Sequence, residues 1–430
     1  MRRHRIISLL ALLILAISAT GYIAARNGSQ FESRGSPVGF PQPVNNAETL
    51  LIGVNVELEQ YDDATLNAHL ADLAQRGVRY IRQEFHWSAI EVSRGQMDWT
   101  VSDRIFSATQ HYQIQVLPVL LSTPLWARAP SEARQPAPIE SAPPLAAGDF
   151  AWFAHQFAQR YEMKMANGQP AILAYQIWDE PNLSAMWGNG LISPAGYVRI
   201  LWAARASIQM VNPKARIVLA ALAPTVEQSD VNLAPEIYLT RLYQLGAHDA
   251  FDVVALKPYG FDYSPMDRRI DPSLLTVSRA ILVREVMVAH GEGNKAIWFT
   301  QFGWNAPLPD VKSKPSNWGS VSESTQAAYT AQFVKRVADE WQWVGAMFIR
   351  TLQPSADASD PQWGFSMLDQ SDKPRPVYDA LTRAIGTAAN ASRAEWAASG
   401  YGQSKYLGLG QTPDYGPNPL ATYSDGWRFG

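Results

Sequence analysis

Eight short apolar runs, each followed by a segment with helical spacing, constrain the fold of this chain more than any other feature. They lie at 50–57, 78–85, 114–122, 172–180, 215–223, 251–259, 296–304 and 344–352. Continuous apolar runs of this length are typical of parallel strands buried on both faces. Eight strand–helix units in succession predict an α/β protein folded as a closed (β/α)8 TIM barrel rather than as an open sheet.

The segment between the third and fourth runs shows the helical pattern most clearly. Over 149–165, Phe150, Phe153, Phe157 and Tyr161 recur at helical spacing, so we expect a helix whose aromatic stripe packs in the core. Apolar residues make up 47% of the 430 residues and charged residues 17%, which is enough for a large core.

The composition excludes several classes of function. A net charge of −3 gives no reason to expect nucleic acid as a partner. Because the chain has no cysteine, disulfides, thiolate metal sites and cysteine nucleophiles are excluded, and seven scattered histidines form no HxxxH pair. We therefore predict no metal and no cofactor. The 15 tryptophans and 17 tyrosines suit sugar faces or a large aromatic core, and composition does not separate the two.

The N-terminus carries an export signature. Arg2, Arg3 and Arg5 precede an apolar run over residues 6–25, which is long for a cleaved signal and just long enough to span a bilayer. We expect export, with the protein either extracellular or membrane-anchored and facing outside. The expected organisation is a signal peptide or membrane anchor at 1–26, a flexible linker at 27–46, the barrel at 47–386, and a C-terminal tail at 387–430 that either packs on the barrel or stays loose.

The ends of the fourth and seventh runs carry the residues of greatest chemical interest, because reactive groups in such barrels lie at the carboxyl ends of the strands. Residues 178–182, Trp-Asp-Glu-Pro-Asn, resemble the Asn-Glu-Pro signature of the clan A glycoside hydrolases, especially families 5 and 39. Residues 299–304, Phe-Thr-Gln-Phe-Gly-Trp, are similar to the clan's T-E-F-G-W segment. Two further segments, 85–99 and 363–378, also match, so the resemblance covers roughly 50–384.

The resemblance implies a pair of catalytic positions. Glu180 matches the general acid/base, and Gln301 occupies the position of the carboxylate nucleophile. Retaining enzymes hold the two carboxylates about 5–5.5 Å apart across one glycosidic bond. We therefore expect Glu180 and Gln301 to face each other at the carboxyl end of the barrel.

Besides Gln301, the chain departs from the clan pattern at three places near this pair. Asp179 stands where the clan has Asn, so that an Asn–Glu pair becomes an Asp–Gln pair. We predict that Asp179 accepts a hydrogen bond from the Gln301 amide, or that both reach a shared water. Lys257 precedes Pro258-Tyr259 where related enzymes often have His, and its charge would favour ionised Glu180 over a general acid. The eighth run ends Ile349-Arg350-Thr351, where the clan commonly has a Trp platform.

Further residues near the strand ends are candidates for substrate binding. Arg82 matches the clan's site arginine, and Trp87, Trp126, Trp187 and Trp304 suit either sugar platforms or core packing. The predicted substrate-binding set is Arg82, His86, Trp87, Trp126, Asn182, Trp187, Lys257, Tyr259 and Trp304.

The favoured function is recognition of an oligo- or polysaccharide without ordinary retaining hydrolysis, because the amide of Gln301 cannot attack the anomeric carbon. One alternative is an active O-glycosyl hydrolase that inverts configuration, with Glu180 as acid and Asp179 as base. Another is a cell-envelope scaffold that uses the barrel only to bind a partner.

Overall fold

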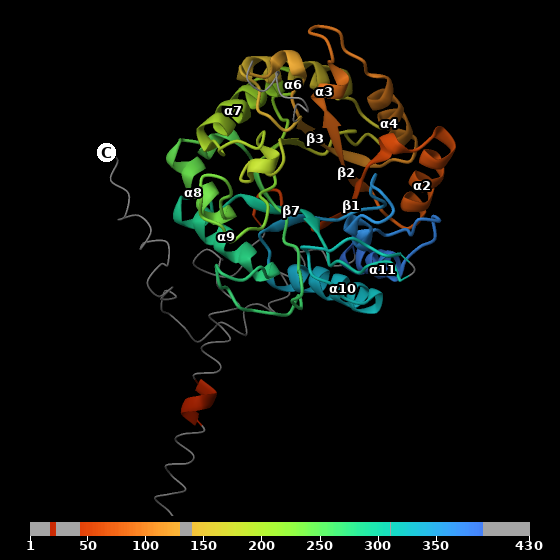
Figure 1. Cartoon of the computed structure of the whole chain (residues 1–430), viewed down its shortest axis with the longest axis vertical. Coiled ribbons are helices and arrows are strands. Elements are labelled where there is room, and N and C mark those ends of the chain that lie inside the picture. The colour runs from red at the N-terminus through yellow and green to blue at the C-terminus, as the bar shows by residue number, and fades with distance from the viewer. Residues whose placement is uncertain (1–17, 23–43, 130–139, 310, 390–430) are drawn as a thin grey trace, which may run out of the picture.

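In a computed structural model of the chain, eight parallel strands pair in sequence order and close into a barrel, with the helices around the outside (Figure 1). This confirms the predicted (β/α)8 fold. The structure describes residues 18–22, 44–129, 140–309 and 311–389. The remainder of the predicted leader, most of the predicted linker and residues 390–430 of the predicted tail lie outside that range, and residues 18–22 are helical.

The strands are β1 (Leu51–Val56), β2 (Tyr80–His86), β3 (Gln115–Leu121), β4 (Tyr175–Ile177), β5 (Ile217–Val218), β6 (Val253–Leu256), β7 (Ala296–Phe302) and β8 (Val344–Ile349). The main helices are α2 (Asp63–Gln75), α3 (Trp87–Ile90), α4 (Thr100–His111), α6 (Ala147–Tyr161), α7 (Pro194–Val211), α8 (Pro235–Gln244), α9 (Ala280–Ala289), α10 (Glu323–Glu340) and α11 (Pro376–Ala389). None of these helices, nor any other in the described part of the chain, is long and apolar enough to cross a membrane.

The helix predicted at 149–165 is α6, and its aromatic stripe is buried as expected. The helix ends four residues earlier than predicted, at Tyr161, because the chain then turns back on itself and Lys164 forms an antiparallel bridge with Pro170. Stacked and edge-on rings, such as Phe106 against Tyr161 with centroids 4.1 Å apart, join α4 to α6.

Two large aromatic side chains fill the lower interior of the barrel. Trp298 of β7 and Phe348 of β8 are fully buried among small residues, and Trp298 Nε1 donates a hydrogen bond to the Asn46 carbonyl at 3.1 Å. Glycine makes room for them, because a Cβ at Gly53 would lie 2.6 Å from the Phe348 ring and one at Gly345 would lie 2.5 Å from Trp298 Nε1. The interior is therefore a packed floor beneath the strand ends rather than a pore.

The upper end of the barrel is irregular at two places that position polar side chains. The β7–β8 register shifts between Phe299 and Phe302, and the buried Asn55 amide donates to the Thr300 and Ile349 carbonyls at 2.8 and 3.0 Å there. After β4, Trp178 and Glu180 adopt positive φ angles of 70° and 47°. Non-glycine residues seldom adopt this conformation, and it occurs preferentially at functional sites.

Candidate functional site

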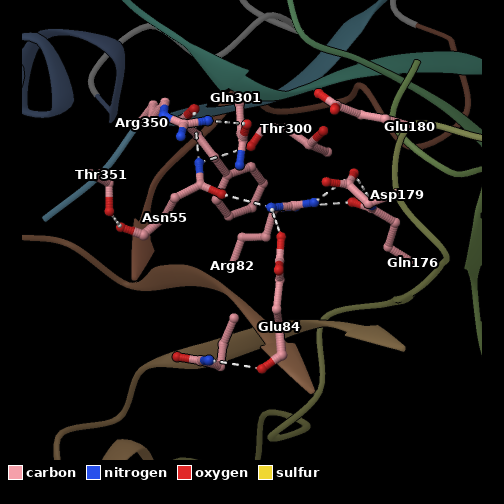
Figure 2. A network of polar contacts seen from close by, with 12 residues as sticks. Asn55, Arg82, Glu84, Gln176, Asp179, Glu180, Thr300, Gln301, Arg350 and Thr351 are labelled. Carbon is pink, nitrogen blue, oxygen red and sulfur yellow. Dashed lines mark hydrogen bonds and ion pairs between the residues drawn. The ribbon is translucent and has the colours of Figure 1, made fainter. Parts of the chain in front are cut away.

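A buried arginine on β2 is the centre of a polar network at the carboxyl end of the barrel. Arg82 donates through Nη1 to Asn55 Oδ1 at 3.0 Å, through Nε to Gln176 Oε1 at 3.0 Å and through Nη2 to Asp179 Oδ1 at 2.9 Å (Figure 2). Asn55 lies on β1 and Gln176 on β4. Asp179 follows β4 and forms a bridge with Ala221. Because each of its three guanidinium nitrogens donates to a buried acceptor, Arg82 is held in one orientation.

Asp179 is surrounded by donors and has almost no contact with solvent. Its Oδ1 accepts from Arg82 and from Gln176 Nε2, the latter at 3.0 Å, and its Oδ2 lies 2.6 Å from Lys257 Nζ. The residue is 2% exposed. Two cations and an amide therefore hold Asp179 as a structural anion.

Lys257, at the end of β6, joins this anion to the candidate acid. Its ammonium also lies 2.7 Å from Glu180 Oε1, so one buried lysine bridges two adjacent carboxylates. Burial lowers the pKa of Lys257, but Asp179 and Glu180 outweigh burial and leave that pKa above its ordinary value. The lysine is therefore charged, and it points inward to the carboxylates. The charged lysine is therefore in direct contact with the residue that the resemblance makes the general acid.

Gln301, on β7, has partners of its own. Its Oε1 accepts a hydrogen bond from the Tyr259 hydroxyl at 2.6 Å. It accepts another from Arg350 Nη1 at 3.1 Å (Figure 2). The prediction that Asp179 and Gln301 share a hydrogen bond is therefore wrong. The partner that compensates the charge of Asp179 is Lys257, since an ammonium neutralises a carboxylate and an amide does not.

Arg350 follows β8 and contacts three aromatic rings. Its guanidinium carbon lies 5.9, 5.6 and 5.6 Å from the ring centroids of Tyr259, Trp318 and Phe365. Nη1 also donates to the Tyr259 hydroxyl at 2.9 Å, and Nη2 donates to Gln362. Its Nε atom is buried and has no hydrogen-bond partner. The residue that follows β8 is thus a cation supported by aromatic rings.

A third carboxylate, that of Glu84 on β2, contacts the network. Glu84 lies 3.5 Å from Arg82 Nη1 and 3.6 Å from His86 Nε2, and its side chain is 31% exposed. Burial would raise the pKa of Glu84, but His86, Arg82 and Lys257 together lower it to about 2. The same contact reverses the effect of burial on His86, whose pKa is raised. His86 Nδ1 lies 3.7 Å from Glu140.

Three of the predicted tryptophan platforms are buried in the core. Trp87 stacks on Phe153 at 5.7 Å, Trp187 lies edge-on to Trp178, and Trp304 donates from Nε1 to the Tyr263 carbonyl at 2.8 Å. All three have little or no exposed surface, so they support the strand ends and offer no ring face to a sugar. They were predicted as substrate-binding residues because sequence does not reveal which side of a loop a ring faces.

Two other predicted binding residues hold loops in place. Asn182 is buried, accepts from the Ala223 amide at 2.9 Å and donates to the Leu233 carbonyl at 2.9 Å, so it braces the loops after β4 and β5 and has no free group for a ligand. Trp126 is partly exposed, with the Arg94 guanidinium 5.0 Å from its ring and its Nε1 bonded to the Glu91 carbonyl. Of the four tryptophans, Trp126 alone keeps part of its surface exposed.

Sequence reasoning missed four residues of the network, namely Asn55, Glu84, Gln176 and Trp318. Glu84 had a signal, because alternate residues of a strand share a face and Arg82, Glu84 and His86 follow this spacing. In the described part of the chain, no group of three or more His, Asp and Glu side chains is arranged to hold a metal ion.

Comparisons with known proteins identify the barrel. No family model matches the sequence, and no curated protein matches it. Among solved structures, a family 39 glycoside hydrolase from Bacteroides cellulosilyticus WH2 superposes with a TM-score of 0.60 at 18% identity, covering 82% of this chain and 66% of that one. This chain therefore spans slightly less than two thirds of the length of the Bacteroides enzyme.

Two further neighbours come from families 39 and 5. A GH39 β-xylosidase from Caulobacter crescentus has a TM-score of 0.55 at 17% identity, covering 80% of this chain and 72% of its own. The GH5_18 structure from Streptomyces cattleya, in complex with GlcNAc, has a TM-score of 0.56 at 14% identity, covering 80% and 81%. The chain thus has the barrel fold of the clan A glycoside hydrolases.

Proposed function

We propose that this protein binds an oligo- or polysaccharide at the carboxyl end of its barrel and does not catalyse ordinary retaining hydrolysis. The clan A fold and the saccharide complexes of its structural neighbours support a carbohydrate ligand. The observation that carries the proposal is Gln301, whose carbonyl oxygen accepts from Tyr259 and Arg350 at the nucleophile position. A neutral amide held in this way cannot form the covalent glycosyl intermediate that retention requires.

The test compares native protein with Gln301→Glu on a panel of oligosaccharides and aryl β-glycosides. We expect native protein to bind at least one saccharide without turnover and Gln301→Glu to gain turnover with retained configuration. The same turnover should disappear when Glu180→Gln is added, because the acid is then missing. Retaining turnover by native protein would overturn the proposal.

Gln301→Glu alone is the appropriate reversal in this geometry. If Asp179 and Gln301 were in contact, as the sequence predicts, a new carboxylate at 301 would lie beside a like charge and Asp179→Asn would also be needed. The structure instead places Arg350 Nη1 at 3.1 Å from the Gln301 oxygen, while Asp179 is neutralised by Arg82 and Lys257. A carboxylate at position 301 would therefore lie beside the Arg350 guanidinium and could form an ion pair with it.

Inverting hydrolysis is the second candidate, and Glu84 is the observation that favours it. Asp179 cannot serve as its base, because both of its oxygens are engaged and the residue is almost fully buried. Glu84 is ionised and partly exposed. It would take a proton from water, whose oxygen attacks the anomeric carbon, while Glu180 protonates the leaving oxygen. Inverted products from native protein that vanish in Glu84→Gln but persist in Asp179→Asn would establish this reaction.

We also propose export, with the barrel outside the cytoplasm. The support is the basic and apolar pattern of the first 25 residues, which lies almost wholly outside the described range. The envelope-scaffold alternative has no specific structural observation in its favour.

A further inference from the structure

The four departures from the clan pattern fall into two local groups with different charge balance. In the first group, Asp179 adds a negative charge and Lys257 adds a positive one, and the two side chains meet at 2.6 Å. Together the two changes add no net charge, and the two new charges pair with each other. It leaves Arg82 with the carboxylate that it contacts at 2.9 Å.

The second group is not balanced. Gln301 removes the negative charge that the resemblance places on β7, and Arg350 adds a positive charge at the end of β8, 3.1 Å from the Gln301 oxygen. Both changes make this half of the site more positive. The hydrogen-bond partners of Arg350 are Tyr259, Gln301 and Gln362, all of which are neutral.

No carboxylate of the described residues forms an ion pair with Arg350. Glu180 and Glu57 are the acidic side chains that raise the pKa of Arg350. Glu180 is in contact with Lys257, and Glu57 Oε2 accepts a hydrogen bond from the Ser355 amide at 2.8 Å. Burial raises the pKa of Glu57, which weakens it as a source of negative charge. Burial lowers the pKa of Arg350, but Tyr259, Glu180 and Glu57 outweigh that effect, so the guanidinium stays charged.

A cation that is largely removed from water and lacks a counter-ion is costly to maintain. The buried Nε of Arg350 adds a donor with no acceptor. Arg350 also lies between the network and the ring of Trp318, which is partly exposed. An anion delivered by a ligand would supply the missing charge and would accept charge-assisted hydrogen bonds.

We propose that the saccharide bound by this protein carries an anionic substituent, a carboxylate or a sulfate ester, and that Arg350 is its counter-ion. This inference rests on the proposed glycan-binding function and names the class of glycan. It makes Arg350 the residue that determines specificity, in a site where Gln301 leaves the guanidinium free to pair with the ligand.

The test measures binding of matched saccharide pairs by calorimetry. One arm compares oligogalacturonates with their methyl esters, and the other compares sulfated galactan oligosaccharides with their desulfated forms. We expect the charged member of one pair to bind about tenfold or more tightly, because hydrogen bonds to charged groups are stronger than neutral ones. Increasing salt should reduce the preference. The arm that shows the preference identifies the anionic group.

Variants then assign the preference to Arg350. Arg350→Met should abolish the preference, Arg350→Lys should keep part of it, and Arg199→Met, which removes the same charge from an exposed position on α7, should leave it unchanged. A second comparison leaves Arg350 in place. Adding Gln301→Glu to Glu180→Gln supplies an internal carboxylate without restoring turnover, and it should weaken binding of the charged saccharide relative to Glu180→Gln alone.

Several results would overturn the inference. Equal binding of charged and neutral members in both arms would contradict it while leaving glycan binding intact. A preference that survives both Arg350→Met and the added Gln301→Glu would assign the anion to another cation. If no saccharide of any kind binds, the proposed function itself fails, which is a distinct outcome.

Discussion

The lysine that bridges Asp179 and Glu180 determines how substitutions at this site should combine. Residues that share a partner show coupled effects on stability, whereas residues with separate partners show additive ones. Asp179 shares a contact with Lys257 and none with Gln301.

We predict that Asp179→Asn lowers the free energy of unfolding by about 2–4 kcal/mol, because it leaves buried cations without their carboxylate. Adding Lys257→Met should recover at least about 1 kcal/mol of that loss, since it removes the unpaired ammonium. Adding Gln301→Glu instead should give a simple sum. Urea unfolding of the single and double variants measures both cycles, and strong coupling between positions 179 and 301 would contradict the assigned partners.

The Glu84–His86 contact predicts a stability that depends on pH. Because the pKa of Glu84 is lowered from 4.5 to about 2, its contribution is full above pH 4.5 and is lost as the pH falls toward 2. Because the pKa of His86 is raised above 6.5, its contribution is full below pH 6.5 and is lost as the pH rises through the raised value.

The native protein should therefore exceed His86→Gln in stability most between about pH 4.5 and 6.5. The difference should be on the order of 0.5–1 kcal/mol, because the His86 side chain is 37% exposed and its contact is screened. Thermal unfolding of both proteins across pH 3 to 9 measures the difference. A gap that grows steadily from acid to alkali would refute the assigned contact.

The residues that the sequence identified correctly and those that it missed differ in what determines their place. Lys257, Tyr259 and Gln301 end consecutive strands, so their presence at one end of the barrel follows from the fold alone. Which of these side chains are in contact depends on their lengths and rotamers, which the sequence does not give. The expected Asp179–Gln301 hydrogen bond was wrong for this reason. The burial of Trp87 and Trp304 depends on how side chains of α6 and α10 pack against them, which strand spacing does not encode.

At the level of elements, the junction of β7 and β8 depends on one side chain from β1. The ladder between these strands shifts register near Thr300, and the Asn55 amide donates to the Thr300 and Ile349 carbonyls while its oxygen accepts from Arg82. The junction and the polar network are therefore coupled through Asn55.

We predict that Asn55→Ala costs about 2–4 kcal/mol, because it leaves buried carbonyls and an arginine donor without partners. Asn67→Ala is the matched control, since Asn67 is exposed on α2 and makes one bond to the Asp63 carbonyl. It should change stability by less than about 0.5 kcal/mol. Chemical denaturation distinguishes the two, and equal losses would contradict the role given to Asn55.

The packed floor of the barrel gives a second prediction at the level of strands, for β1 and β8. Gly53→Ala should destabilise the barrel by about 1–3 kcal/mol or more, because the new Cβ would lie 2.6 Å from both the Phe348 ring and the Tyr80 carbonyl. Gly148→Ala, in the first turn of α6 with nothing within 4 Å, should be neutral or stabilising. Melting temperatures of both variants test this, and a Gly53→Ala protein as stable as the native one would show that the floor is loosely packed.

For the whole molecule, the basic and apolar pattern of the first 25 residues gives a prediction about location. We predict that they are removed from the mature protein or retain it in a membrane, because a basic start precedes about one bilayer length of apolar residues. Cell fractionation with mass spectrometry of the N-terminus distinguishes cleavage from retention. Intact full-length chain found soluble in the cytoplasm would reject export.

The side chains of Trp298 and Phe348 also restrict the path of any long ligand. Because they close the barrel from below, a polymer cannot thread through the molecule and leave on the far side. Under the proposed function, a polysaccharide must either lie across the strand ends or insert one end and leave by the same route. Release would then reverse the path of entry. Competition for polysaccharide binding by short chain-end fragments and by internal fragments would show which of these two modes the protein uses.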